Sequence, residues 1–338
     1  MKFNAVVGNP PYQIMDGGAQ ASSSPIYNYF VESSKKITSQ YVSMIMPSRW
    51  MIGGKGLDQF RDSMIHDRRV EKLYDFLDGK EIFNNVDIKG GICYFLFNKE
   101  YNGKCSVMTI TNDEVIVSNR YLADEKDDIF IRFDVLVQIK KKIQNSGRIM
   151  LDSIVSARKP YGLEAETMLK ASKYNLPNFS NTPIKNGYEI FGLGEKAKRT
   201  WKYIPNNYPL PKISPCLMKY KVFIAEAYGC GAIGEVPSTP GQLCTETFLE
   251  IGPFETKIEA ENMIKYIKTK FFRCLVGIQK QTQHTTKKAY RFVPMINLKN
   301  NEEIDWSKSV TEIDNQLFNM FDFNDKEVKF INSNIKDM

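Results

Sequence analysis

Two consecutive prolines, Pro10 and Pro11, follow directly on the short apolar run of residues 3–8. Each proline locks its φ angle and lacks a backbone N–H, so the segment can neither continue a β-sheet nor form a helix interior. The sequence therefore predicts a strand over residues 3–8 that ends in a stiff loop of hydrogen-bond acceptors at residues 9–12.

This loop reads Asn9-Pro10-Pro11-Tyr12, a combination suited to holding an amino group. The side-chain oxygen of Asn9 and the carbonyl of Pro10 can both accept a hydrogen bond from an exocyclic NH2, and the ring of Tyr12 offers a flat face for stacking. An ordinary proline-rich turn after a strand has the same appearance. The rest of the chain must decide between the two interpretations.

Composition narrows the class of protein. The chain has 338 residues, enough for two domains, with 42% hydrophobic and 25% charged residues, as in a globular protein. No run approaches the roughly 18 apolar residues of a membrane span, and the N-terminus lacks the apolar segment of a signal peptide, so we expect a cytoplasmic protein without a membrane partner. The net charge of +7 suits a polyanionic partner.

Cysteine and histidine are too sparse for a metal centre. The six cysteines show no Cys-x-x-Cys spacing, and the only histidines are His66 and His284. We therefore expect no metal site and no disulfide framework.

The first hundred residues alternate between strand and helix patterns. Ser24 and Pro25 have the residue types of an N-cap and a first helical position, and residues 41–47 form a near-continuous apolar run typical of a buried parallel strand. A helix over residues 57–67 and strands over residues 70–77 and 91–99 complete the rhythm of an α/β doubly wound domain. Ligands of such sheets bind at the carboxyl ends of strands, where Asn9 is expected to lie.

Several segments in order resemble the catalytic half of an adenine-N6 DNA methyltransferase of the TaqI-like, restriction-modification type. Residues 9–12 resemble the catalytic motif, residues 24–27 and 41–52 resemble the next two segments, and residues 86–97 resemble the hairpin that closes the target pocket. The resemblance implies a partial doubly wound (Rossmann-like) methyltransferase sheet followed by an α+β target-recognition domain. The implied division is a catalytic half at residues 1–104, a connecting segment at 105–150 and a target-recognition domain at 151–338.

The resemblance also implies a reaction. Double-stranded DNA would release one adenine into the pocket, and the methyl donor would be S-adenosylmethionine. Asn9 and the Pro10 carbonyl would orient the amine, Pro11 would stiffen the motif, and Tyr12 would stack on the base. Phe97 aligns with the second aromatic of the family, although it could instead be a core residue of its strand, with Tyr94 and Phe95 as competitors for the role.

The sequence departs from the family at the donor site. Members carry a Gly-rich strand-to-helix turn and an acidic residue before the catalytic motif, whereas eight residues precede Asn9 here. Residues 229–234 fit G-x-G-x-x-G, but residues 235–241, with two prolines, cannot form the helix that such a loop requires, so we interpret them as part of a β-hairpin. We expect a truncated or split enzyme whose donor-binding half comes from a second polypeptide.

Basic, aromatic and amide side chains beyond residue 150 suit phosphate and base-edge contacts, although any one of them can be an ordinary surface residue. The candidates for DNA contact are Arg158, Lys159, Arg199, Lys202, Lys219, Lys221, Lys280, Gln281, Gln283 and His284. Apolar spacing also predicts a helix over residues 259–275.

Three other functions stay open. The chain could be a DNA-binding specificity subunit or an inactive remnant without methyl transfer. It could be an endonuclease, although no convincing metal pair is present. The same turn could also hold the exocyclic amine of cytosine in place of that of adenine.

Overall fold

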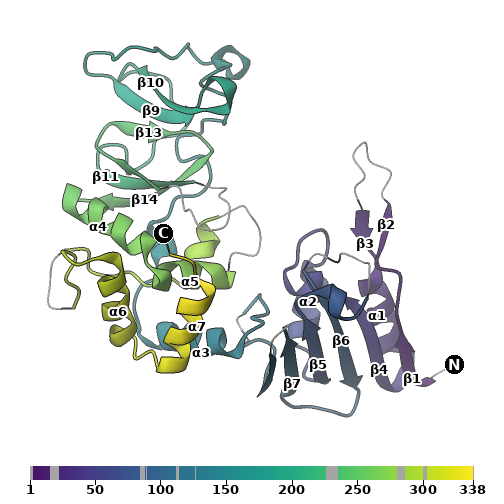
Figure 1. Ribbon diagram of the computed structural model, residues 1–338. Coiled ribbons are helices and arrows are strands. Elements are labelled where there is room, and N and C mark those ends of the chain that lie inside the picture. The colour runs from purple at the N-terminus through teal and green to yellow at the C-terminus, as the bar shows by residue number, and fades with distance from the viewer. Residues whose placement is uncertain are drawn as a thin grey trace. The chain divides into compact units, whose positions relative to one another are not determined.

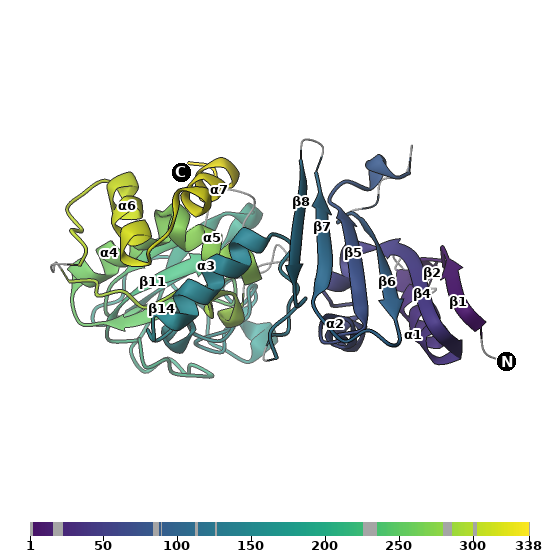
Figure 2. The same cartoon turned by 90° about the horizontal axis from the view of Figure 1, so that it is seen from below.

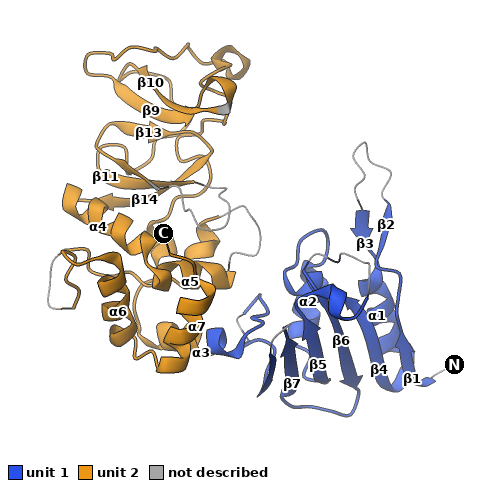
Figure 3. Cartoon of the chain, viewed as in Figure 1, with its two compact units in different colours: residues 1–137 blue, residues 138–338 orange. Residues whose placement is uncertain are grey.

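The computed structural model describes residues 3–15, 23–83, 88, 90–111, 114–125, 127–225, 235–279, 286–299 and 303–337. The chain divides into two compact units, Met1–Val137 and Gln138–Met338 (Figures 1 and 3). This boundary falls inside the connecting segment expected at residues 105–150, whose two strands belong to the sheet of the first unit.

A six-stranded mixed sheet forms the first unit. In spatial order its strands are β1 (Phe3–Gly8), β4 (Thr38–Pro47), β6 (Ile92–Asn98), β5 (Val70–Phe76), β7 (Cys105–Ile110) and β8 (Val115–Arg120). The pairs β1–β4 and β5–β7 are parallel, whereas β6 runs antiparallel to both β4 and β5, and β8 runs antiparallel to β7. The carboxyl ends of β1, β4, β5 and β7 therefore meet at one edge of the sheet. The expected α/β class is confirmed, with a mixed sheet.

Two helices, α1 (Tyr27–Ile37) and α2 (Asp58–Ile65), pack on one face of this sheet (Figure 2). The apolar core between them includes alternate strand residues such as Val42, Leu73 and Phe95. The intervening residues of β4, β6, β5 and β7 point to the other face, where most are only half-buried. Among the described residues of this unit, no helix is seen to cover that second face.

The start of α1 differs from the prediction. Ser24 and Pro25 lie in a strand, β3 (Ser23–Pro25), paired with β2 (Gln13–Met15), and the helix begins at Tyr27 without a side-chain cap. The predicted N-cap at Ser24 is wrong because the short hairpin keeps this segment extended through Pro25.

The second unit combines small sheets with helices. One sheet has the order β10 (Arg199–Ile204), β9 (Tyr188–Leu193), β13 (Gln242–Cys244), and the other has the order β12 (Glu235–Ser238), β11 (Tyr220–Ala225), β14 (Phe248–Phe254). Its helices are α4 (Lys257–Lys268), α5 (Lys270–Gln279), α6 (Val310–Met320) and α7 (Asp325–Asn334), and α3 (Asp134–Asn145) spans the boundary between the units. The single helix predicted over residues 259–275 is interrupted at Thr269, whose backbone is extended.

The glycine-rich residues 229–234 lie outside the described residues. They connect β11 and β12, which are antiparallel neighbours, and a strand rather than a helix follows them. No helix in the described part of the chain is long and apolar enough to cross a membrane.

Candidate active site at the carboxyl end of the first strand

The predicted corner lies at the carboxyl end of β1, directly after Gly8. Asn9 and Pro11 are exposed, Pro10 is buried, and Tyr12 is half-buried. The backbone carbonyl of Tyr12 accepts a hydrogen bond of 3.2 Å from the amide of Ile26, which ties the corner to the start of α1. A buried proline and this hydrogen bond fix the loop while the Asn9 side chain stays accessible.

Tyr12 packs against the core of the first unit. Burial raises the pKa of its hydroxyl, the nearby Cys93 thiol raises it further, and the neighbouring Asn9 side chain partly opposes both. The phenol is therefore neutral at physiological pH, and its ring is held beside Asn9 as a neutral stacking surface.

The chain leaving β4 lines the same edge of the sheet. After the short 3-10 helix Ser48–Met51, residues 53–56 all have positive φ, at 79°, 74°, 48° and 81°. Glycine fills three of these positions, but the third is Lys55. A side chain at Gly53 would meet Arg61 Nη1 at 2.0 Å, and that nitrogen donates to the Ile52 carbonyl at 2.6 Å. The loop is therefore tied to α2 through Arg61, which also pairs with Asp58 at 3.1 Å, a link missing from the sequence-based predictions.

A buried polar cluster lies beneath the strand ends. The Asp75 carboxylate, fully buried in β5, accepts hydrogen bonds from Ser48 Oγ at 2.8 Å and from Arg132 Nη2 at 2.7 Å. No role was predicted from the sequence for Ser48, Asp75 or Arg132. An aspartate in the otherwise apolar half of a strand was the available signal, because a carboxylate is seldom buried without a partner.

Cys93 on β6 is the register partner of Asp75. Its sulfur accepts a hydrogen bond of 3.2 Å from Trp50 Nε1, and burial, reinforced by the charge of Asp75, raises the pKa of the thiol to about 12. The thiol is therefore protonated and unsuited to act as a nucleophile.

Phe97 does not lie at this edge. It is fully buried near the carboxyl end of β6, in register with Val42, and the cations of Lys35 and Arg69 lie 5.1 Å and 4.9 Å from its ring centroid. Because β6 runs antiparallel to β4, its carboxyl end is remote from Asn9. This position is incompatible with base stacking and corrects the expectation for Phe97, which is a core residue.

Phe95 and Tyr94, the alternatives to Phe97 for stacking on the base, do not lie beside Asn9 either. Phe95 is fully buried in the same core. Tyr94 points to the opposite face of the sheet, where it stacks on Tyr74 with 4.3 Å between ring centroids. Among the residues named for stacking, Tyr12 alone lies beside Asn9.

The predicted DNA contacts fall into four groups. Arg158 and Lys159 form ion pairs with Glu246, Lys219 pairs with Glu255 at 2.7 Å, and the Arg199 guanidinium lies over the Phe248 ring. Lys202 is half-buried and donates to the Met168 carbonyl at 2.9 Å. The residues Lys280, Gln281, Gln283 and His284 lie outside the described part of the chain.

Lys221 forms the fourth group. Its side chain is fully buried, and Nζ donates to the carbonyls of Leu217, Lys219 and Thr239 at 3.1 to 3.3 Å. Burial lowers the pKa of this amine to about 8. A DNA contact by Lys221 is incompatible with these bonds, which instead tie together three loop carbonyls.

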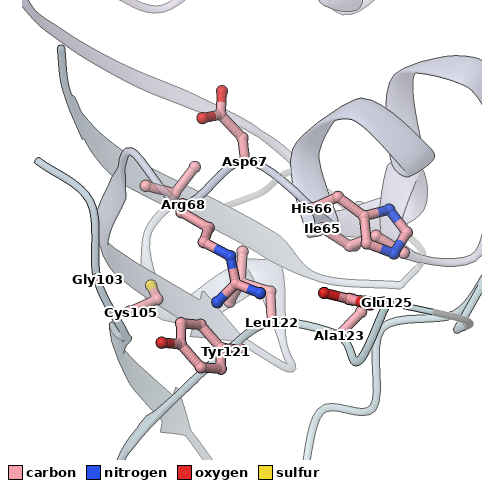
Figure 4. A pocket seen from close by; sticks show the side chains of 11 residues that line it. Ile65, His66, Asp67, Arg68, Gly103, Cys105, Tyr121, Leu122, Ala123 and Glu125 are labelled. Atoms are coloured by element: carbon pink, nitrogen blue, oxygen red, sulfur yellow. The ribbon is translucent and has the colours of Figure 1, made fainter.

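Two hollows lie at the opposite edge of the first sheet. The smaller, about 30 Å³, lies between Asp67, Arg68, Cys105 and Tyr121, with the Arg68 guanidinium 3.9 Å from the Tyr121 ring centroid (Figure 4). This volume suffices for about one water molecule. The larger, open hollow has lysines, arginines and carboxylates in near balance along its wall. In the part of the chain that the structure describes, no group of three metal-ligating side chains is found.

Part of the first unit matches known proteins in sequence. Residues 1–83 match the family of Eco57I restriction-modification methylases. An uncharacterized adenine-specific methylase of Mycoplasma pneumoniae is 34% identical over 112 residues, which cover 32% of this chain and 26% of that protein. The resemblance to restriction-modification adenine methylases is therefore confirmed, while the matched region spans about a quarter of the curated relative.

Solved structures of restriction-modification enzymes are also similar. The type IIG restriction endonuclease BpuSI matches with a TM-score of 0.39 and 13% identity, over 92% of this chain and 48% of that one. The type IIL enzyme MmeI, solved in complex with DNA, matches with a TM-score of 0.39 and 9% identity, over 85% of this chain and 45% of that one.

Proposed function

We propose that this chain is the catalytic half of a site-specific DNA adenine-N6 methyltransferase of a restriction-modification system, acting on an adenine swung out of double-stranded DNA. The observation that carries the proposal is the accessible Asn9 beside Tyr12 at the carboxyl end of β1, inside the region that matches restriction-modification methylases. The similarity to an adenine-specific methylase favours adenine over cytosine.

The chemistry of the corner follows from its acceptors. Asn9 Oδ1 and the Pro10 carbonyl each accept one N–H of the adenine amine, which directs the nitrogen lone pair out of the base plane. Tyr12, held by its packing, stacks on the ring and replaces part of the stacking lost from the duplex, a cost of about a few kcal/mol. Positioning of this kind supplies most of the rate when no covalent intermediate forms.

The donor is proposed to be S-adenosylmethionine, bound in part by a second polypeptide. The family's glycine-rich donor turn precedes the catalytic motif, whereas the glycine-rich residues 53–56, which lead from β4 to α2, follow it. The activity of this chain alone is correspondingly expected to be low.

Two surfaces of the first unit support such a partner. Within the described residues β1 pairs with β4 alone, and its Phe3 and Val7 side chains are 46% and 78% exposed. The second face of the sheet carries half-buried apolar side chains such as Ile45 and Tyr94. Unpaired strand edges and contiguous apolar surface commonly mark protein interfaces.

Target recognition is proposed for the region 151–338. Of its candidate residues, Arg158, Lys159, Arg199 and Lys219 have side chains with substantial exposure. The acidic partners of Arg158, Lys159 and Lys219 would have to release them to DNA phosphates. Because contacts with phosphates release counterions, we expect binding to weaken steeply with salt.

The test is methyl transfer by the full chain, with and without the polypeptide encoded nearest to it. Labelled S-adenosylmethionine and plasmid DNA are supplied, and the nucleosides are identified by mass spectrometry. We expect N6-methyladenine, and a loss of at least about 100-fold in rate for Asn9→Ala with DNA affinity unchanged, because the lost contacts orient the reacting atom. Asn102→Ala, an exposed loop change at the opposite edge of the sheet, is the matched control and should be fully active.

Other results identify the alternatives. Detection of N4-methylcytosine would show that the target is cytosine and not adenine. DNA binding without any methylated base would indicate a specificity subunit or an inactive remnant. Mg²⁺-dependent cleavage without methylation would indicate an endonuclease.

A further inference from the structure

We propose that Asp75 and Arg132 are positioning residues that anchor Gly90 and Gly91, the described end of the loop before β6, at the edge of the candidate base-binding site. We call this pair the Asp75–Arg132 anchor. The proposal rests on the proposed function only in assigning a base to the corner at Asn9; the anchoring itself is a property of the fold.

The anchor is a two-point ion pair at the carboxyl end of β5. Arg132 Nη2 donates a hydrogen bond of 2.7 Å to Asp75 Oδ1, and Arg132 Nε lies 2.7 Å from Asp75 Oδ2 as an ion-pair contact without hydrogen-bond geometry. The carboxylate is fully buried and also accepts from Ser48 Oγ, at the end of β4. A planar guanidinium opposite a carboxylate fixes orientation as well as distance, which a lysine ammonium does not.

The same guanidinium holds the loop. Arg132 Nη2 also donates to the Gly90 carbonyl at 2.7 Å, and the next carbonyl, that of Gly91, accepts from the Ser48 amide at 2.9 Å. Gly91 has a φ of +87°, and a side chain there would lie 2.1 Å from the Phe76 carbonyl. The end of the loop is therefore clamped between the ends of β4 and β5.

Arg132 is itself fixed through its backbone. Its carbonyl accepts from Thr109 Oγ1 on β7 at 3.0 Å, and the preceding carbonyl, of Ile131, accepts from Arg120 Nη2. Arg132 is thus held both at its backbone and at its guanidinium, so it links the position of the loop to that of β7.

The position of the anchor distinguishes it from a merely stabilising ion pair. A buried ion pair contributes little net stability compared with well-packed apolar residues, so a role in stability alone gives weak reason for it. Lys35 and Asp67 form a comparable pair, 2.9 Å apart, at the opposite edge of the same sheet. Of these two pairs, only the Asp75–Arg132 anchor donates to the loop before β6, which ends two residues before Cys93, a neighbour of Tyr12.

The test compares Arg132→Lys with Arg132→Met in the full chain. Lysine preserves the charge opposite Asp75 but cannot pair with both oxygens and bind Gly90 together. We expect hydrogen exchange at the Ser48 and Gly91 amides to rise at least about tenfold in both variants, because both free the Gly90 carbonyl. We expect methylation to slow about tenfold, mainly in kcat, with KM for DNA nearly unchanged, because a loosened loop orients the base less well.

Lys35→Met is the matched control, since it removes a buried ion pair from the same sheet without touching the loop. It should leave exchange at Ser48 and Gly91 and the ratio of kcat to KM unchanged. An Arg132→Lys variant that matches the wild type in exchange and kcat would overturn the proposal, because the ion pair alone would then suffice.

The two proposals fail separately. If the wild-type chain and its partner methylate nothing, the proposed function fails, and the exchange of Ser48 and Gly91 in Arg132→Met still decides whether the anchor holds the loop. If exchange rises but kcat does not fall, the anchor exists and its positioning role is refuted.

Discussion

Gly91 shows how strictly a single residue beside the candidate site is constrained. Its φ of +87° and the Phe76 carbonyl 2.1 Å from the place of a Cβ leave no room for a side chain, whereas Gly54, with a φ of +74°, has open space around it. We expect Gly91→Ala to cost about 3 kcal/mol in the free energy of unfolding, and Gly54→Ala only about 1 kcal/mol, the cost of a left-handed backbone. Urea unfolding followed by circular dichroism measures both, and equal costs would contradict this account.

The corner at Asn9–Tyr12 was predictable at the residue scale, but its surroundings were not. Proline geometry is local, so Asn9–Tyr12 could be placed at the end of a strand from the sequence alone, and the structure has them there. Phe97 was misassigned because the direction of β6 depends on strand pairing, which no local pattern encodes. Lys221 was misassigned because three backbone carbonyls, including that of Thr239 18 residues away, satisfy its ammonium group in place of solvent.

At the scale of elements, β1 is an exposed edge strand of the six-stranded sheet. The Val7 side chain of β1 is 78% exposed. The Val117 side chain of β8, the outermost strand on the other side of the sheet, is 61% exposed. We expect Val7→Lys to change stability by no more than about 0.5 kcal/mol, because the side chain contributes little to the core. Val7→Lys should weaken binding of the proposed donor-binding polypeptide at least about tenfold, since a charge on β1 must be desolvated when the partner docks there.

Isothermal titration with the two purified proteins measures this effect, and Val117→Lys is its control. Equal affinities for wild type and Val7→Lys would exclude β1 as the docking edge. A loss caused by Val117→Lys instead would move the interface to β8.

Helix caps show which element boundaries a sequence determines. α6 begins at a capping box in which Ser309 Oγ accepts from the Glu312 amide and the Glu312 carboxylate accepts from the Ser309 amide at 3.0 Å. We expect Ser309→Ala to lower the free energy of unfolding by about 1 kcal/mol, measurable in urea. Ser24 has the same residue type but does not cap α1, because pairing with β2 competes for its backbone, and such pairing cannot be read locally.

At the scale of the whole molecule, the two units have separate apolar cores and share one chemical feature, buried thiols. Core residues of the first unit gather around Val42 and Phe95, and those of the second around Ile190 and Phe223. Apolar runs of strand length made β1, β4, β5 and β6 of the first unit predictable. The short strands of the second unit were not predictable in detail, since their pairing joins segments as distant as Tyr188–Leu193 and Gln242–Cys244.

The buried thiols predict how stability depends on pH. Burial raises the pKa of Cys93, Cys105 and Cys274 to about 12 and that of Cys216 to about 11. In the unfolded chain a thiol ionises near about 8.5, so above that pH the unfolded state releases protons that the folded state retains. Stability from these groups is thus fully present below about pH 8.5 and falls as pH rises toward 12, by up to about 1.4 kcal/mol per thiol and pH unit.

Urea unfolding between pH 8 and 10.5 tests this, with Cys105→Ala and Cys274→Ala as one variant in each unit. Each variant should show a shallower loss of stability with pH than the wild type, because one fewer buried thiol resists ionisation. Identical slopes in wild type and variants would mean that tyrosine or lysine ionisation dominates the alkaline transition and that the buried thiols contribute little to it.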